Sequence, residues 1–432
     1  MNNFQTILTA VFIAIFVFAV LVFSGMLNIG QKDKATTGLT GNIIVWGTLD
    51  SKNMDSLLPE VDPSKESELS IKYIQKNVDT YQEELIEAFA LGTAPDLFII
   101  DPSMIIRNDK FVYKTSYDSF PEKIFRDTYI DGADIYLGAD GIYAFPFLVD
   151  PMVMYYNKNL LSNEGIATPP SYWDEFFILN SKLTKKNTNG GIDKSMIALG
   201  GYDNINNAKE ILSTLFIQSN SPIITRDGAG YEVYLDSSDD STLSPFKALE
   251  FYMSFSKNSN EAYSWNKSLP KSLDMFTSGK LAFYLGYASE LFKIQEINTN
   301  LSFDIAKIPQ LRNIENKRNY GKIYAIAINK KSGNLSTAVS VASKLGTADV
   351  AKSLSINFSL PTASRSLLTE KPKQTYLYSF WDSAIISRSW IDPDKKKSDK
   401  IFENMIDGVL LGGDTTSGAL RNAGDQLNLL LK

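Results

Sequence analysis

The sequence predicts a mixed α/β protein built on a mostly parallel, doubly wound sheet. Short apolar or alternating runs typical of strands are separated by runs with the helical spacing of apolar residues. This alternation favours a parallel sheet with helices on both of its faces. The 432 residues, 44% of them hydrophobic and 21% charged, are enough for two or three lobes at roughly 150 residues per domain.

The N-terminal residues predict a membrane segment. Residues 7–27 carry no charged side chain, and a spanning helix needs about 20 apolar residues. We expect a transmembrane anchor over residues 4–27. The alternative is a cleaved signal peptide, although the hydrophobic region of a signal peptide usually has only about 7–15 residues. Residues 28–41 then predict a short flexible linker.

Strands and helices alternate after the linker. Residues 42–46 and 69–76 have strand patterns. A helix over residues 80–92 begins with the spacing of a capping box and ends at a glycine. Residues 96–101 predict the next buried strand. The final helix is expected from about residue 416.

Polar and aromatic residues follow two of these strands. Trp46, Thr48 and Asp50 come after the first strand, and Asp101 comes after the third. Ligands bind at the carboxyl ends of strands in doubly wound sheets. An aromatic face together with hydroxyl and carboxylate groups suits a sugar. For Asp50 and Asp101 the alternative role is to cap a helix.

The composition excludes several classes of chemistry. The chain contains neither histidine nor cysteine, so Ser-His-Asp and Cys-His catalysis, zinc thiolate sites and lipid-modified cysteines are excluded. Carboxylate chemistry, such as a glycosidase pair, and an oxygen-ligand Ca²⁺ or Mg²⁺ site remain. The net charge is −6 with no dense basic stripe, which argues against a nucleic-acid partner. We expect no enzyme activity, cofactor or metal.

Five stretches occur in a recognisable order: "GTAPDLFIID", "YAFPFLVDPMVMYYNKNLL", "PPSYWDEFFILNSKLT", "WNKSLPKSLDMFTSGKLAFYLGY" and "FDIAKIPQ". Together they resemble the extracellular solute-binding proteins of family 1, the maltose-binding-protein-like receptors of ABC importers. The resemblance runs from about Asn42 to the C-terminus. It implies a two-lobed periplasmic-binding-protein-like fold of type II with three inter-lobe crossings. Lobe 1 is expected to contain residues 42–151 and 281–329, and lobe 2 residues 152–280 and 330–432.

The resemblance also implies ligand contacts. The acid at Asp150 would face the cleft between the lobes, whereas a core carboxylate paired with Lys or Arg is the alternative. Tyr202 and Asn204 lie in a glycine-rich loop where the family has contacts, or else they serve a turn and a helix cap. Gly286 and Tyr287 are expected on the floor of the cleft.

Three further site residues come from the later part of the chain. Trp265 is the best aromatic candidate from the second lobe, with core packing as the alternative. Trp381 and Arg388 belong to a C-terminal region from which relatives often supply a stacking aromatic residue.

The sequence therefore predicts a monomeric receptor tethered to the cell membrane by a single-pass helix, with its binding domain on the extracytoplasmic side. It would close around a sugar or oligosaccharide and deliver it to the permease subunits of an ABC importer. A tethered glycan-binding adhesin or sensor is the alternative, and a carboxylate-based carbohydrate-active enzyme is a weaker one. A polyamine or another cation is the alternative ligand.

Overall fold

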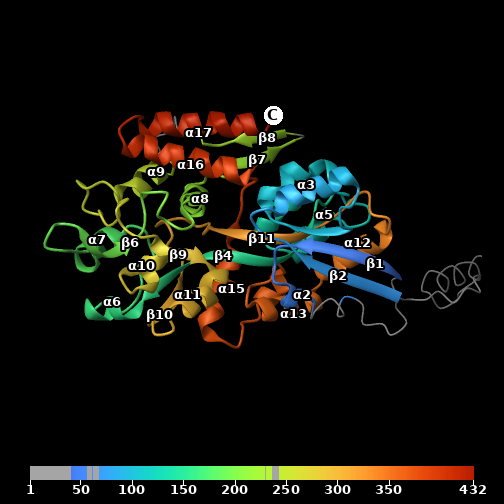
Figure 1. The fold of residues 1–432 in the computed structure, drawn as a ribbon, viewed down its shortest axis with the longest axis horizontal. Helices are drawn as coiled ribbons and strands as arrows, with labels where there is room; N and C mark the ends of the chain where they lie inside the picture. Colours follow the sequence, from blue (N-terminus) through green and yellow to red (C-terminus); the bar gives the residue numbers. More distant parts are fainter. Residues whose placement is uncertain (1–39, 56–60, 62–67, 229, 236–242) are drawn as a thin grey trace, which may run out of the picture.

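Strand β4 (Phe145–Asn157) belongs to two sheets (Figure 1). Its first half pairs with strand β11 (Asn319–Ile328). Its second half, from Met152, pairs with β9 (Leu281–Tyr287) and β10 (Phe303–Lys307). All but one of its thirteen residues are buried, because the strand has a neighbour on each side and helices over its faces. The apolar run in the sequence is therefore the shared strand of two lobes.

The computed structural model describes residues 40–55, 61, 68–228, 230–235 and 243–432. None of the helices within these ranges is long and apolar enough to cross a membrane. The predicted anchor, residues 4–27, and almost all of the predicted linker lie outside the described residues.

The first sheet has the strand order β2–β1–β3–β11–β4. Strand β1 (Thr40–Gly47) pairs in parallel with β2 (Glu68–Gln75) and β3 (Leu97–Ile100), as the alternating pattern predicts. Strand β11 runs antiparallel to both β3 and β4. The helices of this lobe are α2 (Ser51–Asp55), α3 (Tyr81–Leu91), α4 (Ile105–Asn108), α5 (Glu122–Thr128), α12 (Leu335–Leu345), α13 (Ala348–Phe358) and α14 (Arg365–Leu368).

Helix α3 tests the helix-start and helix-stop signals that were identified in the sequence. Its C-terminus is Gly92, whose φ of 73° is left-handed and favours glycine. The predicted capping box at its N-terminus is wrong, because the Thr80 side chain makes no cap hydrogen bond and donates to the carboxylate of Glu84 instead, at 2.5 Å. Phe89 packs edge-on against Phe98 of β3 with ring centroids 5.4 Å apart.

The second sheet has the order β4–β9–β6–β5, with β10 also paired to β4. Strand β6 (Ile192–Ile197) runs parallel to β9, and β5 (Lys185–Lys186) is its short edge partner. A separate hairpin is formed by β7 (Ile224–Asp227) and β8 (Gly230–Val233). The helices of this lobe are α6 (Lys158–Asn163), α7 (Glu175–Leu183), α8 (Ala208–Gln218), α9 (Pro245–Ser254), α10 (Ser272–Thr277), α11 (Leu291–Ile297), α15 (Tyr378–Ile385), α16 (Lys395–Leu410) and α17 (Thr416–Leu430).

The strand pairings correct the predicted lobe boundaries. The sequence predicts residues 281–329 in lobe 1, but β9 and β10, which lie in this range, both pair with the second half of β4. Residues 335–358 were expected in lobe 2, but α12 packs on β1 and α13 packs on α2. The chain returns to the first sheet between β10 and β11 and leaves it again between α14 and α15. A strand belongs to the lobe that contains the strands with which it pairs. Strand β9 pairs with β6 and with the second half of β4, and therefore belongs to lobe 2.

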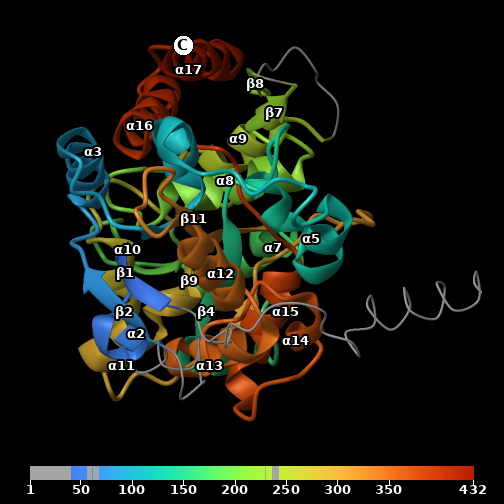
Figure 2. The ribbon, with the colours of Figure 1, turned by 90° about the vertical axis from the view of Figure 1, so that its right-hand side faces the viewer.

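The C-terminal helices α16 and α17 pack on each other, and α17 also packs on α9 and β8. Leu420, Ala423 and Leu427 are buried on one face of α17, as its spacing predicts. Figure 2 shows the start of α16 beside α3 of the other lobe. This approach of the two lobes forms one wall of the site.

Candidate functional site

Two pockets lie between the lobes. The smaller, about 230 Å³, is bounded by the start of α3, the end of β3 and the start of α16. We call it the acidic pocket, because its lining includes Asp79, Glu83, Asp101, Asp394 and Asp399 against Arg107, Lys395 and Lys396. The larger, about 590 Å³, lies between the 3₁₀ turn η4 (Asp131–Tyr136) and β7. We call it the arginine pocket, because Arg126, Arg226 and Arg388 line it.

Strand β11 supplies an aromatic row near the acidic pocket. Side chains alternate between the two faces of a strand, and Tyr320, Lys322 and Tyr324 are half-buried while their neighbours Gly321 and Ile323 are buried. Tyr324 lines the acidic pocket. The alternation therefore puts two phenol rings and an ammonium group on the same face of the strand.

Tyr287, at the end of β9, completes this row. Its ring centroid lies 6.5 Å from that of Tyr320, and the ammonium nitrogen of Lys322 lies 4.0 Å from its centroid. Burial raises the pKa of Tyr287 and Tyr320, and the nearby Glu210 carboxylate raises them further. Burial likewise raises the pKa of Tyr324. We call Tyr287, Tyr320 and Tyr324 the tyrosine row; near neutral pH it consists of uncharged phenols.

Sequence reasoning singled out Tyr287 but missed Tyr320, Lys322, Tyr324 and Glu210. The sequence "YGKIY" of residues 320–324 has the alternating pattern of a strand, and this pattern places Tyr320, Lys322 and Tyr324 on one face. Glu210 has no such signal, because its approach to the row depends on how helix α8 packs on β11.

Asp150 lies at the junction of the two sheets. Its side chain is only 2% exposed, and it stands opposite Lys322 in the β4–β11 register. Its carboxylate accepts hydrogen bonds from the backbone N–H of Ser289, at 2.9 Å, and from the Ser289 hydroxyl, at 2.6 Å. Burial raises the pKa of Asp150 to about 6, although the charge of Lys322 and the bonds from Ser289 oppose this shift. The carboxylate thus ties β4 to the turn after β9.

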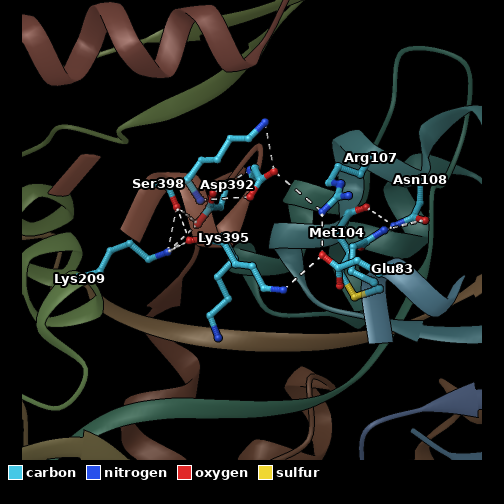
Figure 3. A network of polar contacts seen from close by, with 12 residues as sticks. Glu83, Met104, Arg107, Asn108, Lys209, Asp392, Lys395 and Ser398 are labelled. Atoms are coloured by element: carbon cyan, nitrogen blue, oxygen red, sulfur yellow. Dashed lines mark hydrogen bonds and ion pairs between the residues drawn. The ribbon is translucent and has the colours of Figure 1, made fainter. Parts of the chain in front are cut away.

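A buried lysine holds the segment that borders both pockets, residues 388–399 (Figure 3). The ammonium nitrogen of Lys209, in α8, lies 2.9 Å from Asp392 and 2.8 Å from Asp399, and it donates to the hydroxyl of Ser398 at 2.9 Å. Burial alone would lower the pKa of Lys209, but the charges of Asp392, Glu210 and Asp399 raise it. The lysine is therefore charged and compensates the acids around it.

Ion pairs cross between the lobes beside this segment. Lys396 of α16 lies 3.4 Å from Glu83 of α3. Arg107 of α4 lies 3.9 Å from both Glu83 and Asp394 (Figure 3). The pair of Lys396 and Glu83 is exposed, and exposed pairs contribute at most about 1 kcal/mol. These ion pairs orient the two lobes but contribute little free energy to holding them together.

Several of the predicted site residues lie at these pockets. Thr48 and Asp101 line the acidic pocket, and Asp101 also caps the 3₁₀ turn η2 (Pro102–Met104) by accepting from the Ser103 N–H at 2.8 Å. The hydroxyl of Tyr202 donates to Asp399 of the acidic pocket at 3.3 Å. Arg388 lines the arginine pocket.

Trp265 and Asn204 contact each other in the structure. Trp265 has no exposed surface, and its indole N–H donates to the Asn204 side-chain oxygen at 3.0 Å. The amide group of Asn204 donates to the carbonyls of Asn266 and Leu269 at 2.9 and 3.0 Å. Together the two side chains hold the loop before α10.

Four other predicted residues lie away from the pocket linings. Asp50 is exposed and accepts from the Asn53 N–H at 3.0 Å, so it caps α2. Trp46 is covered by the Lys76 ammonium, 3.7 Å above its ring. A Cβ added to Gly286 would lie 2.6 Å from the Tyr284 ring, so this glycine serves packing. Trp381 lines a separate pocket of about 390 Å³ between α13 and α15.

One cluster of acids could hold a cation. Carboxylate oxygens of Asp203, Glu403 and Asp407 lie within 4.8 Å of one another. Lys400 lies 2.7 Å from Glu403 and Lys267 lies 2.8 Å from Asp407, so lysines already compensate two of the three charges. The cluster lines neither pocket between the lobes.

A two-lobed α/β protein with polar pockets between its lobes has the architecture of a binding protein that closes around a ligand. Residues 64–352 match the family of bacterial extracellular solute-binding proteins. The chain belongs to this family, which confirms the resemblance drawn from the sequence. It is a solute-binding receptor and not an enzyme.

Solved structures share the fold. The cyclic α-maltosyl-1,6-maltose binding protein from Arthrobacter globiformis superposes with a TM-score of 0.74 at 15% identity, over 91% of this chain and 99% of that chain. The sugar-binding protein MalE from Xanthomonas citri gives 0.70 at 16% identity, over 90% and 97%. A cyclo/maltodextrin-binding protein complexed with maltotetraose gives 0.73 at 14% identity, over 92% and 98%. These matches confirm the two-lobed fold.

The Lys209 network predicts the effect of removing its cation. Replacing Lys209 by Met leaves the buried carboxylate of Asp392 without its partner, and we expect the free energy of unfolding to fall by about 3–5 kcal/mol. Urea denaturation measures this loss. The control Lys185→Met removes an exposed pair with Glu164 and should cost at most about 1 kcal/mol. Equal losses in the two variants would contradict the assignment.

The raised pKa of Asp150 predicts a dependence of stability on pH. Between its ordinary pKa and about 6 the folded state binds more protons than the unfolded state, so the wild-type free energy of unfolding falls as pH rises through this window. Asp150→Asn can accept from the Ser289 N–H through its amide oxygen and donate to the Ser289 hydroxyl through its amide nitrogen, and it removes this fall because it does not titrate. Relative to wild type, its stability should rise by up to about 3 kcal/mol between pH 4 and pH 7.

Urea denaturation at several pH values tests this expectation. The control Asp425→Asn changes an exposed carboxylate on α17 and should follow the wild-type profile. If Asp150→Asn also follows the wild-type profile, Asp150 is not the titrating group.

Proposed function

We propose that this protein is an extracytoplasmic receptor that closes around a sugar or oligosaccharide and delivers it to the permease of an ABC importer. The observation that carries the proposal is the tyrosine row beside the acidic pocket. Flat aromatic faces stack on the apolar faces of sugar rings, and carboxylates such as Asp101 accept hydrogen bonds from sugar hydroxyls. The sugar ligands named for the similar structures support the same ligand class.

The tyrosine row offers hydroxyl donors as well as ring faces. Because burial raises their pKa, the phenols of Tyr287, Tyr320 and Tyr324 are neutral and can donate hydrogen bonds. Neutral donors next to carboxylate acceptors match the paired donors and acceptors of a polyhydroxylated ligand. Because the ion pairs between the lobes are weak, most of the free energy that stabilises the closed state would come from contacts with the ligand.

A cationic ligand such as a polyamine is the second candidate. Of the five carboxylates that line the acidic pocket, three form ion pairs: Glu83, Asp394 and Asp399. Among the described residues Asp79 and Asp101 form none, so these two are available to a cation. A saccharide remains the first choice because Tyr320 and Tyr324 are partly exposed aromatic residues, and Tyr324 lines the acidic pocket beside its carboxylate acceptors.

We place the receptor at the outer side of the cell membrane, held by the apolar segment of residues 4–27. A spanning helix holds a protein effectively irreversibly, whereas a single acyl chain gives marginal binding. Tethering keeps a receptor at high effective concentration near its permease. The linker of residues 28–41 is long enough for the lobes to tilt toward a partner.

Replacing Tyr320 by Ala should weaken saccharide binding about tenfold. Loss of one aromatic contact costs about 0.5–1.5 kcal/mol beyond its buried area, and 1.4 kcal/mol is a factor of ten in affinity. The full chain in a detergent without a sugar head group is screened by thermal shift against maltooligosaccharides, other oligosaccharides and spermidine. Dissociation constants are then measured for the best ligand.

The control for this experiment is Tyr376→Ala, which removes an exposed tyrosine outside both pockets. It should bind the ligand as the wild type does. Unchanged affinity in Tyr320→Ala would place the ligand elsewhere. A response to spermidine alone would support the cationic ligand instead of the saccharide.

Membrane tethering predicts an intact N-terminus on the native protein. Intact-mass spectrometry of protein recovered from the membrane fraction should show residues 1–27 still attached. A mature form beginning near Gly25 and free of the membrane would show that the segment is a cleaved signal peptide.

A further inference from the structure

The arginine pocket is lined by three arginines and three acids. Arg126, Arg226 and Arg388 line it together with the acids Glu122, Asp131 and Asp134. A further arginine, Arg365, pairs with Asp131 from outside the pocket lining. The set therefore has four arginines and three carboxylates, with one positive charge in excess.

The ion pairs show which arginine carries the excess. Arg126 pairs with Glu122 at 2.9 Å and also with Asp134. Arg388 pairs with Asp131 at 2.7 Å. Among the described residues no carboxylate pairs with Arg226, and its guanidinium is the uncompensated charge of this pocket.

Arg226 reaches across the two lobes. It comes from β7 of the second lobe, and its Nη1 donates to the carbonyl of Leu137 of the first lobe at 3.1 Å. Its other terminal nitrogen, Nη2, is buried and has no hydrogen-bond partner among the described residues. A buried donor without a partner costs free energy, and native structures contain few of them. An acceptor supplied by a ligand would satisfy this nitrogen.

Arg388 lies in a partly desolvated part of the same pocket. Burial lowers the pKa of Arg388 and the nearby Arg318 lowers it further, although the charge of Asp131 opposes both. An added anion would oppose this lowering as Asp131 does. The volume of about 590 Å³ lies within the range of about 300–1,000 Å³ that small-molecule sites have.

We propose that the arginine pocket binds one anionic group, a carboxylate or a sulfate, carried by the saccharide ligand, and that Arg226 is the residue that selects for it. The guanidinium group matches the geometry of an oxyanion with two parallel hydrogen bonds. This inference rests on the proposed saccharide receptor and narrows its ligand to acidic saccharides. Because Arg226 also contacts the first lobe, binding of the anion favours closure of the lobes.

The test compares saccharides that differ only in their charge. The full chain, in a detergent without a sugar head group, is titrated calorimetrically with oligogalacturonate and with its methyl ester. A second pair consists of a sulfated galactan oligosaccharide and its desulfated form. We expect one of the two charged forms to bind at least tenfold more tightly than its neutral counterpart, and the pair that shows this separates carboxylate from sulfate. The preference should fall as salt is raised from 50 mM to 500 mM, because salt screens charges.

Arg226→Gln should abolish the preference, so that the charged and the neutral form bind this variant with equal affinity. Arg226→Lys, which keeps the charge without the planar fork, should retain part of the preference. The control Arg421→Gln removes an exposed arginine on α17 and should retain all of it. Should Arg226→Gln fail to fold, the comparison of charged and neutral saccharides on the wild type and on Arg226→Lys still decides the proposal.

The outcomes separate this inference from the proposed function. Neutral saccharides that bind as tightly as both charged forms overturn the inference and leave the saccharide receptor standing. A preference that survives unchanged in Arg226→Gln overturns the role of Arg226. Absence of binding for every saccharide overturns both.

Discussion

The architecture depends on one constraint: strand β4 must be paired along its whole length although its partners change at Pro151. Before this residue β4 pairs with β11, and after it β4 pairs with β9 and β10. Backbone groups buried in such a junction need hydrogen-bond partners throughout. The result is a fully paired strand of thirteen residues that belongs to both lobes. Side chains that face the space between the lobes are positioned by this strand and by β11 next to it.

Charges at the junction are compensated in different ways, and the differences indicate what each region does. Asp150 is held by two hydrogen bonds from Ser289, and Lys209 is surrounded by carboxylates of the segment 388–399. These groups have their partners within the chain and therefore serve the architecture. Among the described residues, Nη2 of Arg226 has no hydrogen-bond partner, and Asp79 and Asp101 of the acidic pocket form no ion pair. Uncompensated charge thus concentrates in the pockets between the lobes, where a ligand can supply the opposite charge.

The predictions from the sequence succeeded where a local pattern carried the signal. The parallel strands β1, β2 and β3, the end of α3 at Gly92 and the buried face of α17 follow from periodicity and turn chemistry. The family followed from the order of several stretches rather than from any single motif. The lobe boundaries failed at β9, because a strand's partner is chosen by long-range pairing. The burial of Trp265 and its bond to Asn204, 61 residues away in the chain, have no local signal in the sequence.

The sequence by itself determined the chemistry that is open to this protein and the local elements from which it is built. Without histidine or cysteine the chain is limited to carboxylate, hydroxyl, amide, amine and guanidinium groups, and the alternation at Tyr320, Lys322 and Tyr324 is that of a strand with two unlike faces. Only the tertiary structure decided which of these groups meet. Tyr287 meets Tyr320, Lys209 meets Asp392, and Arg226 reaches Leu137. Contacts between residues so far apart in the chain depend on strand pairing and helix packing, which local periodicity does not encode.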